Sequence, residues 1–244
     1  MYASPRPRAR AFSLSRRVVL GKHFSLVASD SFKLGAYRAD PSGPAKGGIV
    51  VIQEIFGVNH HIRAVCDRLA AEGYAAVAPA LFDRQQPNFE CGYSPDEIAN
   101  ARKFVANPDW GAMMRDTQAA IDDAKKSGPA AIIGFCMGGT IAFLAAAKLN
   151  GLSAAVGYYG GQIAKNVDAK PKIPVQLHFG DKDASIPMSD VDMIKQKRGG
   201  DCEIYVYPDA QHGFHCDERG SYNAAASKLA WQRSLAFLQK HLTK

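Results

Sequence analysis

From about residue 48 onward, short apolar runs alternate with longer stretches in which apolar residues recur every three or four positions. The short runs are typical of strands buried on both faces, and the longer stretches of amphipathic helices. Their alternation predicts βαβ units on a mostly parallel sheet. The expected strands cover residues 47–53, 74–80, 130–135, 154–159, 175–179 and 203–208, and the expected helices cover residues 61–72, 95–106, 110–126, 137–149, 189–197 and 222–241.

Two shorter stretches with alternating apolar and polar residues precede the first buried strand. They read HFSLVAS and FKLGAYRA, and the Asp30-Ser31 pair between them favours a tight turn, so an antiparallel hairpin is expected. No linker divides the rest of the chain, and it contains no internal repeat. The pattern therefore predicts a single domain over residues 21–244, of the doubly wound α/β class with helices flanking the sheet.

The net charge of +7 is concentrated in the first seventeen residues, which contain no acidic residue. Five arginines carry it: Arg6, Arg8, Arg10, Arg16 and Arg17. Without them the rest of the chain has a charge of only +2, so we expect no nucleic-acid partner, because that binding needs clustered basic side chains. The composition of segment 1–20 occurs in organellar transit peptides, but a disordered basic extension or an upstream start is the favoured interpretation.

Neither the apolar runs nor the cysteines indicate a membrane protein, a disulfide framework or a metal site. The chain has no apolar run of about 18 residues, the length that predicts a membrane span. Its five cysteines are odd in number, and none forms a CxxC pair. A reducing compartment suits this cysteine usage. We therefore expect a cytoplasmic protein with no membrane partner, no metal and no cofactor, as a monomer or a weak homodimer.

The segment AAIIGFCMGG, residues 130–139, carries the clearest chemical signal. An apolar strand leads directly into Gly-x-Cys-x-Gly-Gly and then into an alanine-rich helix, which is typical of a strand-to-helix elbow. Gly134 and Gly138 would let strand and helix approach closely, and Cys136 at the apex would project above the sheet. The helix N-terminus there favours a thiolate and a developing oxyanion. A buried structural cysteine is the alternative, but the whole context favours a nucleophile.

A cysteine nucleophile needs a base, because a free thiol is mostly protonated at neutral pH. In doubly wound hydrolases the acid and the histidine follow the nucleophile in that order, each after a later strand. Asp183, in the loop after the expected strand 175–179, is the expected acid, and Asp181 is the runner-up. His212, after the next strand, is the expected base, and His215 is a weaker rival.

These features together resemble the dienelactone hydrolase family of α/β-hydrolases, over roughly residues 22–242. The matching stretches are GIVVIQEIFGV, APALFDRQ, GFCMGG, AVGYYGG, HFGDKDASIP and AQHGF. As a set they are far more specific than any one motif. The resemblance implies the α/β-hydrolase fold and carboxymethylenebutenolidase activity, with Cys136, Asp183 and His212 as the catalytic triad.

The resemblance also implies roles for residues that the pattern alone leaves unexplained. In the family, the glutamate at the position of Glu54 helps to deprotonate the thiol when substrate arrives. The backbone N–H groups of Ile55 and Met137 are expected to form the oxyanion hole, since fixed backbone donors suit a developing charge. Arg84 matches an arginine that binds the substrate carboxylate, and Tyr159 is a further candidate for substrate binding.

At one position the chain departs from the family pattern. A second arginine is expected four residues after the histidine, where this chain has Cys216. Arg219 is the candidate to replace that arginine at the site. The departure leaves the triad intact but puts the dienelactone itself in question as the substrate.

The sequence therefore predicts a hydrolase that opens a small ester or lactone bearing a carboxylate, through a thioester on Cys136. Thiolate leaves a tetrahedral adduct more readily than an ordinary alkoxide, so activated enol lactones or aryl esters are favoured over alkyl esters. Two alternatives stay open. One is a broader carboxylesterase or another lactonase with the same triad, and the other is a non-catalytic redox sensor that uses Cys136.

Overall fold

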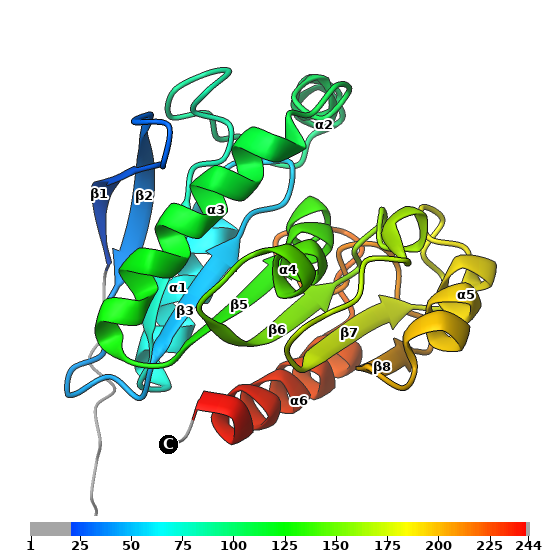
Figure 1. The fold of residues 1–244 in the computed structure, drawn as a ribbon. Coiled ribbons are helices and arrows are strands. Elements are labelled where there is room, and N and C mark those ends of the chain that lie inside the picture. Colours follow the sequence, from blue (N-terminus) through cyan, green and yellow to red (C-terminus); the bar gives the residue numbers. More distant parts are fainter. Residues whose placement is uncertain (1–20, 243–244) are drawn as a thin grey trace, which may run out of the picture.

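The computed structural model describes residues 21–242, and the expectation for segment 1–20 lies outside this range. Its centre is an eight-stranded sheet with the strand order β1-β2-β4-β3-β5-β6-β7-β8 (Figure 1). Strands β1 and β2 form the expected antiparallel hairpin, β2 pairs antiparallel with β4, and all other pairs are parallel. The strands are Lys22–Val27, Lys33–Ala39, Gly48–Ile52, Ala75–Pro79, Ala130–Phe135, Leu152–Tyr158, Val175–Gly180 and Cys202–Tyr207.

Within the described residues, six α-helices flank this sheet. Each of them lies in a segment where the apolar periodicity predicts a helix. Helix α1 packs on β2, β3 and β4, and α3 covers β3 and β4 from the opposite face (Figure 1). Helix α4 packs on β5 and β6, and α6 on β6 and β7. In chain order the helices are His60–Ala71, Pro95–Lys103, Trp110–Ala124, Met137–Lys148, Met188–Arg198 and Ala224–Leu242. The predicted α/β-hydrolase architecture is confirmed.

Local chemistry explains where several of these elements begin and end. Helix α2 starts with a capping box, in which Ser94 and Glu97 satisfy each other's backbone N–H groups. It ends at Lys103, earlier than expected, and Pro108 downstream disfavours helical backbone at the residue before it. Strands β3, β4, β5 and β7 are buried along their whole length, which explains why they appear as continuous apolar runs.

None of the helices between residues 21 and 242 is both long enough and apolar enough to cross a membrane.

The tightest packing in the fold lies where β5 turns into α4. A Cβ atom on Gly134 would stand 1.9 Å from the backbone oxygen of Gly138. One on Gly138 would stand 2.4 Å from the backbone oxygen of Ile52 in β3. Both neighbours are backbone atoms and cannot move aside as a side chain would. The elbow glycines are therefore required by the close approach of the helix to two strands, as the sequence pattern predicts.

Substituting Gly134 with alanine should lower the free energy of unfolding by about 3 kcal/mol, because the added methyl group meets backbone on a packed helix. Urea unfolding monitored by circular dichroism measures this change. Gly43→Ala is the matched control, since no atom lies within 4 Å of its added Cβ, and it should change the unfolding free energy little. Equal stability of Gly134→Ala and the wild type would contradict this account of the elbow.

Candidate active site

Three polar side chains of the expected triad follow three parallel strands and meet at one edge of the sheet. Cys136 follows β5 directly, Asp183 lies in the loop after β7, and His212 lies in the loop after β8. Because β5, β7 and β8 run parallel, their carboxyl ends open onto the same edge. Parallel topology therefore brings together residues that are up to 76 positions apart in sequence.

Cys136 stands at the apex of the elbow, immediately before the first residue of α4. Its backbone has φ 55°, a left-handed conformation that is strained for a non-glycine residue. The Cys136 N–H donates to the backbone oxygen of Tyr158 at 3.0 Å, which ties the apex to β6. The side chain is partly exposed and lines the cavity described below. This is the position that a nucleophile on an elbow requires.

His212 is oriented by Asp183. The Nδ1 atom of His212 lies 2.8 Å from Oδ2 of Asp183, whose side chain is fully buried. The other carboxylate oxygen of Asp183 accepts from the backbone N–H of Ser185 at 2.8 Å, so the acid is held on both sides. Asp181, the runner-up, has no hydrogen bond or ion pair with His212 within residues 21–242, and its buried Oδ1 has no hydrogen-bond partner there. The structure thus pairs His212 with Asp183.

The protonation of His212 is set by competing effects. Burial disfavours the imidazolium form, but the Cys136 thiolate charge and hydrogen bonds to Asp183 and Cys136 outweigh it and raise the pKa of His212 to about 10. The rival His215 shows the opposite behaviour. Its pKa lies well below the usual range because burial and the charge of Arg68 disfavour its cation, and its ring stacks on Phe135 and hydrogen-bonds Ser227. His215 is therefore a core residue.

Two backbone donors face the same cavity as the thiol. Ile55 and Met137 both line the cavity, and the N–H of neither has an acceptor within residues 21–242. Met137 is the first residue of α4, where helix N–H groups are free and the helix dipole favours negative charge. A carbonyl oxygen next to Cys136 would find these donors already in place.

Glu54 follows the end of β3 and is only 1% exposed. Its Oε1 accepts a hydrogen bond from Nη1 of Arg219 at 3.1 Å, and the described residues contain no hydrogen bond between Glu54 and Cys136. Burial raises the pKa of Glu54, while the charges of Arg219 and His212 oppose this shift. The Arg219 guanidinium also lies over the rings of Phe56 and Tyr93, at 5.4 and 5.7 Å from the centroids. Arg219 thus reaches the site, and its partner there is Glu54.

The cavity above these groups has a volume of about 630 Å³. Its wall combines the reactive groups with apolar side chains of α2 and of the segment that leads into α3, and with polar groups of the loops after β6 and β7. The lining residues are Ile55, Phe56, Ile98, Arg102, Val105, Ala106, Pro108, Trp110, Cys136, Met137, Thr140, Gly161, Gln162, Ser185, His212 and Arg219. The sequence pattern did not predict that α2 lines the cavity. Which face of α2 meets the cavity depends on how the flanking loops place the helix.

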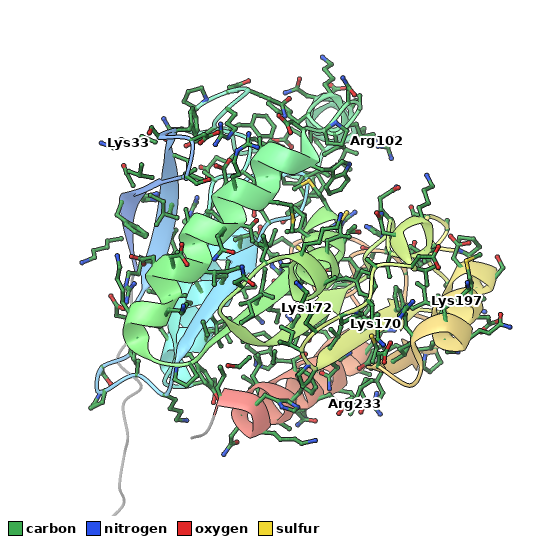
Figure 2. All side chains as sticks on the ribbon, in the orientation of Figure 1. Lys33, Arg102, Lys170, Lys172, Lys197 and Arg233 are labelled. Carbon is green, nitrogen blue, oxygen red and sulfur yellow. The ribbon has the colours of Figure 1, made fainter. Side chains whose placement is uncertain are left out.

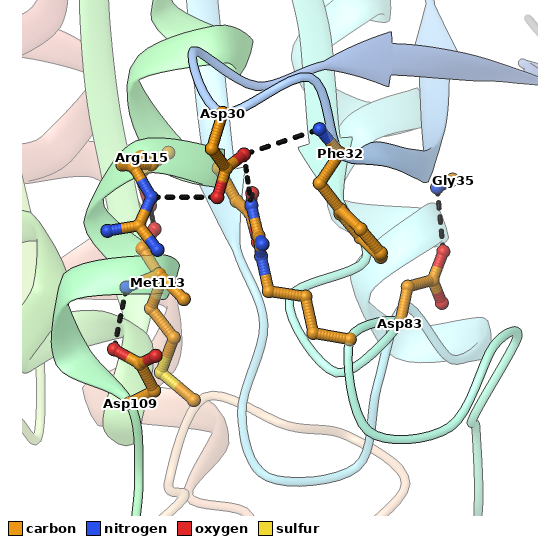
Figure 3. A network of polar contacts seen from close by, with 11 residues as sticks. Asp30, Phe32, Gly35, Asp83, Asp109, Met113 and Arg115 are labelled. Atoms are coloured by element: carbon orange, nitrogen blue, oxygen red, sulfur yellow. Dashed lines mark hydrogen bonds and ion pairs between the residues drawn. The ribbon is translucent and has the colours of Figure 1, made fainter.

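Arg84, a predicted substrate-binding residue, lies elsewhere in the structure and does not line the cavity. Its Nε and Nη2 atoms donate to the carboxylate of buried Asp116 at 2.8 Å each, and Nη2 also bonds Asp30 at 2.9 Å. The Arg84 guanidinium stacks over the Phe32 ring at 4.2 Å. Asp30 further pairs with Arg115, and Figure 3 shows this network at the hairpin turn. Arg84 therefore ties the hairpin to α3, and its expected contact with a substrate carboxylate stays a prediction.

Tyr159, the other such candidate, is fully buried and also does not line the cavity. Its ring lies 5.1 Å from the His212 ring, centroid to centroid, and its hydroxyl has no hydrogen-bond partner among the described residues. Burial and then the charge of Glu54 raise its pKa well above the usual range. Tyr159 thus packs against His212, and its expected contact with substrate stays a prediction.

One group of residues has the atoms, but not the electrostatics, of a metal site. Ligand-type atoms of buried Glu54, His61 and Cys216 lie within 4.8 Å of one another. However, Arg219 already neutralises the Glu54 carboxylate, and burial and the Glu54 charge raise the pKa of Cys216 to about 12. The Cys216 thiol instead donates to the Tyr93 hydroxyl at 3.3 Å. A paired carboxylate and a neutral thiol fit a polar support for the site better than a cation centre.

The model of the dienelactone hydrolase family matches residues 34–242 of the chain. The chain belongs to the dienelactone hydrolase family. Its members act on carboxylic ester bonds, so the chain is a carboxylic ester hydrolase, as the sequence predicts.

Several relatives cover nearly the whole described range. A protein of Synechocystis sp. with the provisional name carboxymethylenebutenolidase is 37% identical over 235 residues, which is 88% of this chain and 95% of its own length. The carboxymethylenebutenolidase of Pseudomonas putida is 33% identical over 229 residues, 90% of this chain and 97% of its own. A provisionally named dienelactone hydrolase structure from Klebsiella pneumoniae is 35% identical, has a TM-score of 0.75 and covers 88% of this chain and 97% of its own.

The raised pKa of His212 in this dienelactone hydrolase family member can be measured in solution. Ring nitrogen NMR shifts should show His212 losing its proton near pH 10, and Cys136→Ala should lower that pKa, because the thiolate charge and hydrogen bond disappear while burial remains. A folded-state pKa above the unfolded value of about 6.5 also stabilises the fold fully below that pH, and this contribution is lost as the pH rises through about 10. The His215 signal is the internal control and should not move. An unchanged His212 pKa in Cys136→Ala would contradict the coupling.

Proposed function

We propose that the chain opens activated carboxylic esters and lactones, with enol lactones as the preferred class, through a thioester on Cys136. The observation that carries the proposal is the Asp183–His212 pair beside an elbow cysteine, in a cavity that also presents two unpaired backbone N–H groups. Membership of the dienelactone hydrolase family supports the substrate class, and a relative from Pseudomonas putida is named carboxymethylenebutenolidase.

The first half-reaction forms the thioester. The Cys136 thiolate attacks the carbonyl carbon, and the oxygen that becomes negative is stabilised by the N–H groups of Ile55 and Met137. When the tetrahedral adduct collapses, the bond to the leaving oxygen breaks and His212 donates its proton to that oxygen. The raised pKa of His212 supports this role, because the histidine then enters the reaction as the proton donor.

The second half-reaction releases the acid. His212, now neutral and held by Asp183, takes a proton from water, and the resulting hydroxide attacks the thioester carbonyl. Collapse of this second adduct breaks the carbon–sulfur bond and restores the thiolate beside the imidazolium. The sum of both halves is one ester bond and one water consumed, with one carboxylic acid and one alcohol or enol formed.

Leaving-group chemistry narrows the substrate. Thiolate departs from a tetrahedral adduct more readily than an alkoxide, so an adduct of an alkyl ester mostly returns to the starting ester. An enol or aryl oxygen is stabilised by conjugation, and its adduct collapses forward to the thioester. We therefore place enol lactones and aryl esters first, and a broader carboxylesterase with the same triad is the second candidate, because Cys216 stands where the family has an arginine.

Glu54 and Arg219 have a further role in this proposal. A carboxylate on the substrate binds Arg219 and so competes with Glu54 for the guanidinium. Where Cys136 is still in the thiol form, the released Glu54 carboxylate, buried and with a raised pKa, takes its proton, and returns it to the sulfur when the product leaves and Arg219 pairs with Glu54 again. Arg219 takes the place of the missing family arginine, and the anion on the substrate itself promotes formation of the nucleophile.

Steady-state kinetics with a dienelactone, p-nitrophenyl acetate and a saturated γ-lactone test the proposal. The wild type should have the highest kcat/KM for the dienelactone and the lowest for the γ-lactone. Cys136→Ala should lower kcat/KM by about a thousandfold or more for each substrate that is turned over. Cys91→Ser is the matched control, because Cys91 is partly exposed but does not line the cavity, and its rates should stay within about twofold of wild type.

If Cys136→Ala keeps a tenth of the wild-type rate, the assignment of the nucleophile is wrong. If the γ-lactone is opened as fast as the dienelactone, the leaving-group argument fails, and the broader esterase is the better description.

A further inference from the structure

The charge of the cavity wall is strongly one-sided. Its lining contains two arginines, Arg102 and Arg219, and the catalytic His212, but no aspartate or glutamate. A cavity with cationic groups and no acid in its wall favours anionic ligands. Arg219 is already assigned to the reacting end, next to Glu54, so the second arginine has no role in the mechanism described above.

Arg102 differs from every other arginine in the described residues. Each of the others has a hydrogen bond, an ion pair or an aromatic ring as a partner of its side chain, whereas Arg102 has none. It lies on α2 and is exposed (Figure 2), and it is one of the residues that line the cavity. The other arginines between residues 21 and 242 are Arg38, Arg63, Arg68, Arg84, Arg115, Arg198, Arg219 and Arg233.

Arg102 is also separate from the reacting groups. The main charges that act on His212, Glu54 and Arg219 come from one another and from cysteines, acids and Tyr159, and Arg102 is not among them. Arg102 therefore offers a guanidinium with no side-chain partner among the described residues, on α2 rather than on the loops that carry the reacting groups.

The wall around Arg102 is apolar. Ile98, on the same helix, and Val105, Pro108 and Trp110, after it, line the cavity beside Arg102. Trp110 gives this wall an aromatic surface on which a flat or aliphatic chain can pack. The cavity volume of about 630 Å³ lies in the range for ligands much larger than a single lactone ring. The space beyond the thiol is thus suited to an apolar arm.

We propose that Arg102 anchors a second anionic group, so that the preferred substrates are esters or lactones with an apolar arm that ends in a carboxylate. The ester or lactone carbonyl of such a substrate lies at Cys136, as in the proposed function, and the inference rests on that function. An arginine fork binds a carboxylate in a fixed orientation, and the length of the arm then sets which ester bond reaches Cys136.

The anchor binds a group of the substrate that takes no part in the reaction, so its contact with the substrate is the same before and in the transition state. Such a contact lowers KM and leaves kcat unchanged. The contact is also partly exposed to solvent, so added salt should weaken it.

Two esters of matched chain length test the anchor: p-nitrophenyl octanoate, with a neutral tail, and mono-p-nitrophenyl suberate, with a carboxylate at the tail. Arg102→Gln should raise KM for the suberate ester by about five- to tenfold, as expected for the loss of a charged hydrogen bond, with kcat unchanged. KM for the octanoate ester should stay within about twofold. Lys103→Gln is the control, because it removes the same charge from the next residue, which does not line the cavity.

The inference is overturned if Arg102→Gln leaves KM for the suberate ester unchanged or raises KM equally for both esters. It is also overturned if Lys103→Gln raises KM for the suberate ester by the same factor. Calorimetric binding of free suberate and octanoate to the wild type separates this inference from the proposed function, since it requires no turnover. Octanamide, which has the same chain but no charge, is the neutral reference for these two anions. Suberate and octanoate should bind more tightly than octanamide, and only binding of the two anions should weaken in Arg102→Gln. If neither ester is hydrolysed, the proposed function fails, and the binding data alone decide on the anchor. Equal weakening of all three ligands, or none, would refute it.

Discussion

The contact of α4 with the backbones of β3 and β5 is the constraint on which the rest of the site depends. Gly134 and Gly138 remove the two side chains that would hold the helix away, and the turn between them forces φ 55° on Cys136. The strain places the thiol above the sheet and Met137 at the first turn of the helix, beside the loop that carries Ile55. In the proposed mechanism, a single backbone arrangement thus positions the nucleophile and the two donors for the oxyanion, and none of these groups has to move during the reaction.

Around this elbow the charges are arranged in two linked pairs. Asp183 bonds to His212, and Arg219 bonds to buried Glu54. We propose that Arg219 replaces the family arginine that is missing at Cys216. Arg219 lies three residues further along the same loop. Gly213, with φ 81°, lies against the Arg219 guanidinium, where a Cβ atom would stand 2.4 Å from Nη1. The loop that carries His212 therefore also has the space that Arg219 needs.

The sequence was sufficient for the strands and for the elbow at Cys136, because buried parallel strands and a glycine-flanked turn leave local signatures. It was insufficient where a side chain's partner lies far along the chain. Arg84 bonds to acids 32 and 54 positions away, and no local pattern shows that these acids capture it. Tyr159 is next to a matching motif but points into the core. Arg102 was missed because the side of α2 that meets the cavity is decided by tertiary packing.

The central claim is that Cys136 carries the acyl group between the two half-reactions. Rapid-quench mass spectrometry with p-nitrophenyl acetate tests it most directly, on the wild type, His212→Ala and Cys136→Ala. The account predicts an acetyl group that maps to Cys136, in a larger fraction of His212→Ala than of wild type because water is no longer activated, and no adduct in Cys136→Ala. Turnover by the wild type with no acetyl on Cys136 in any sample, or with the acetyl on another residue, would contradict the account.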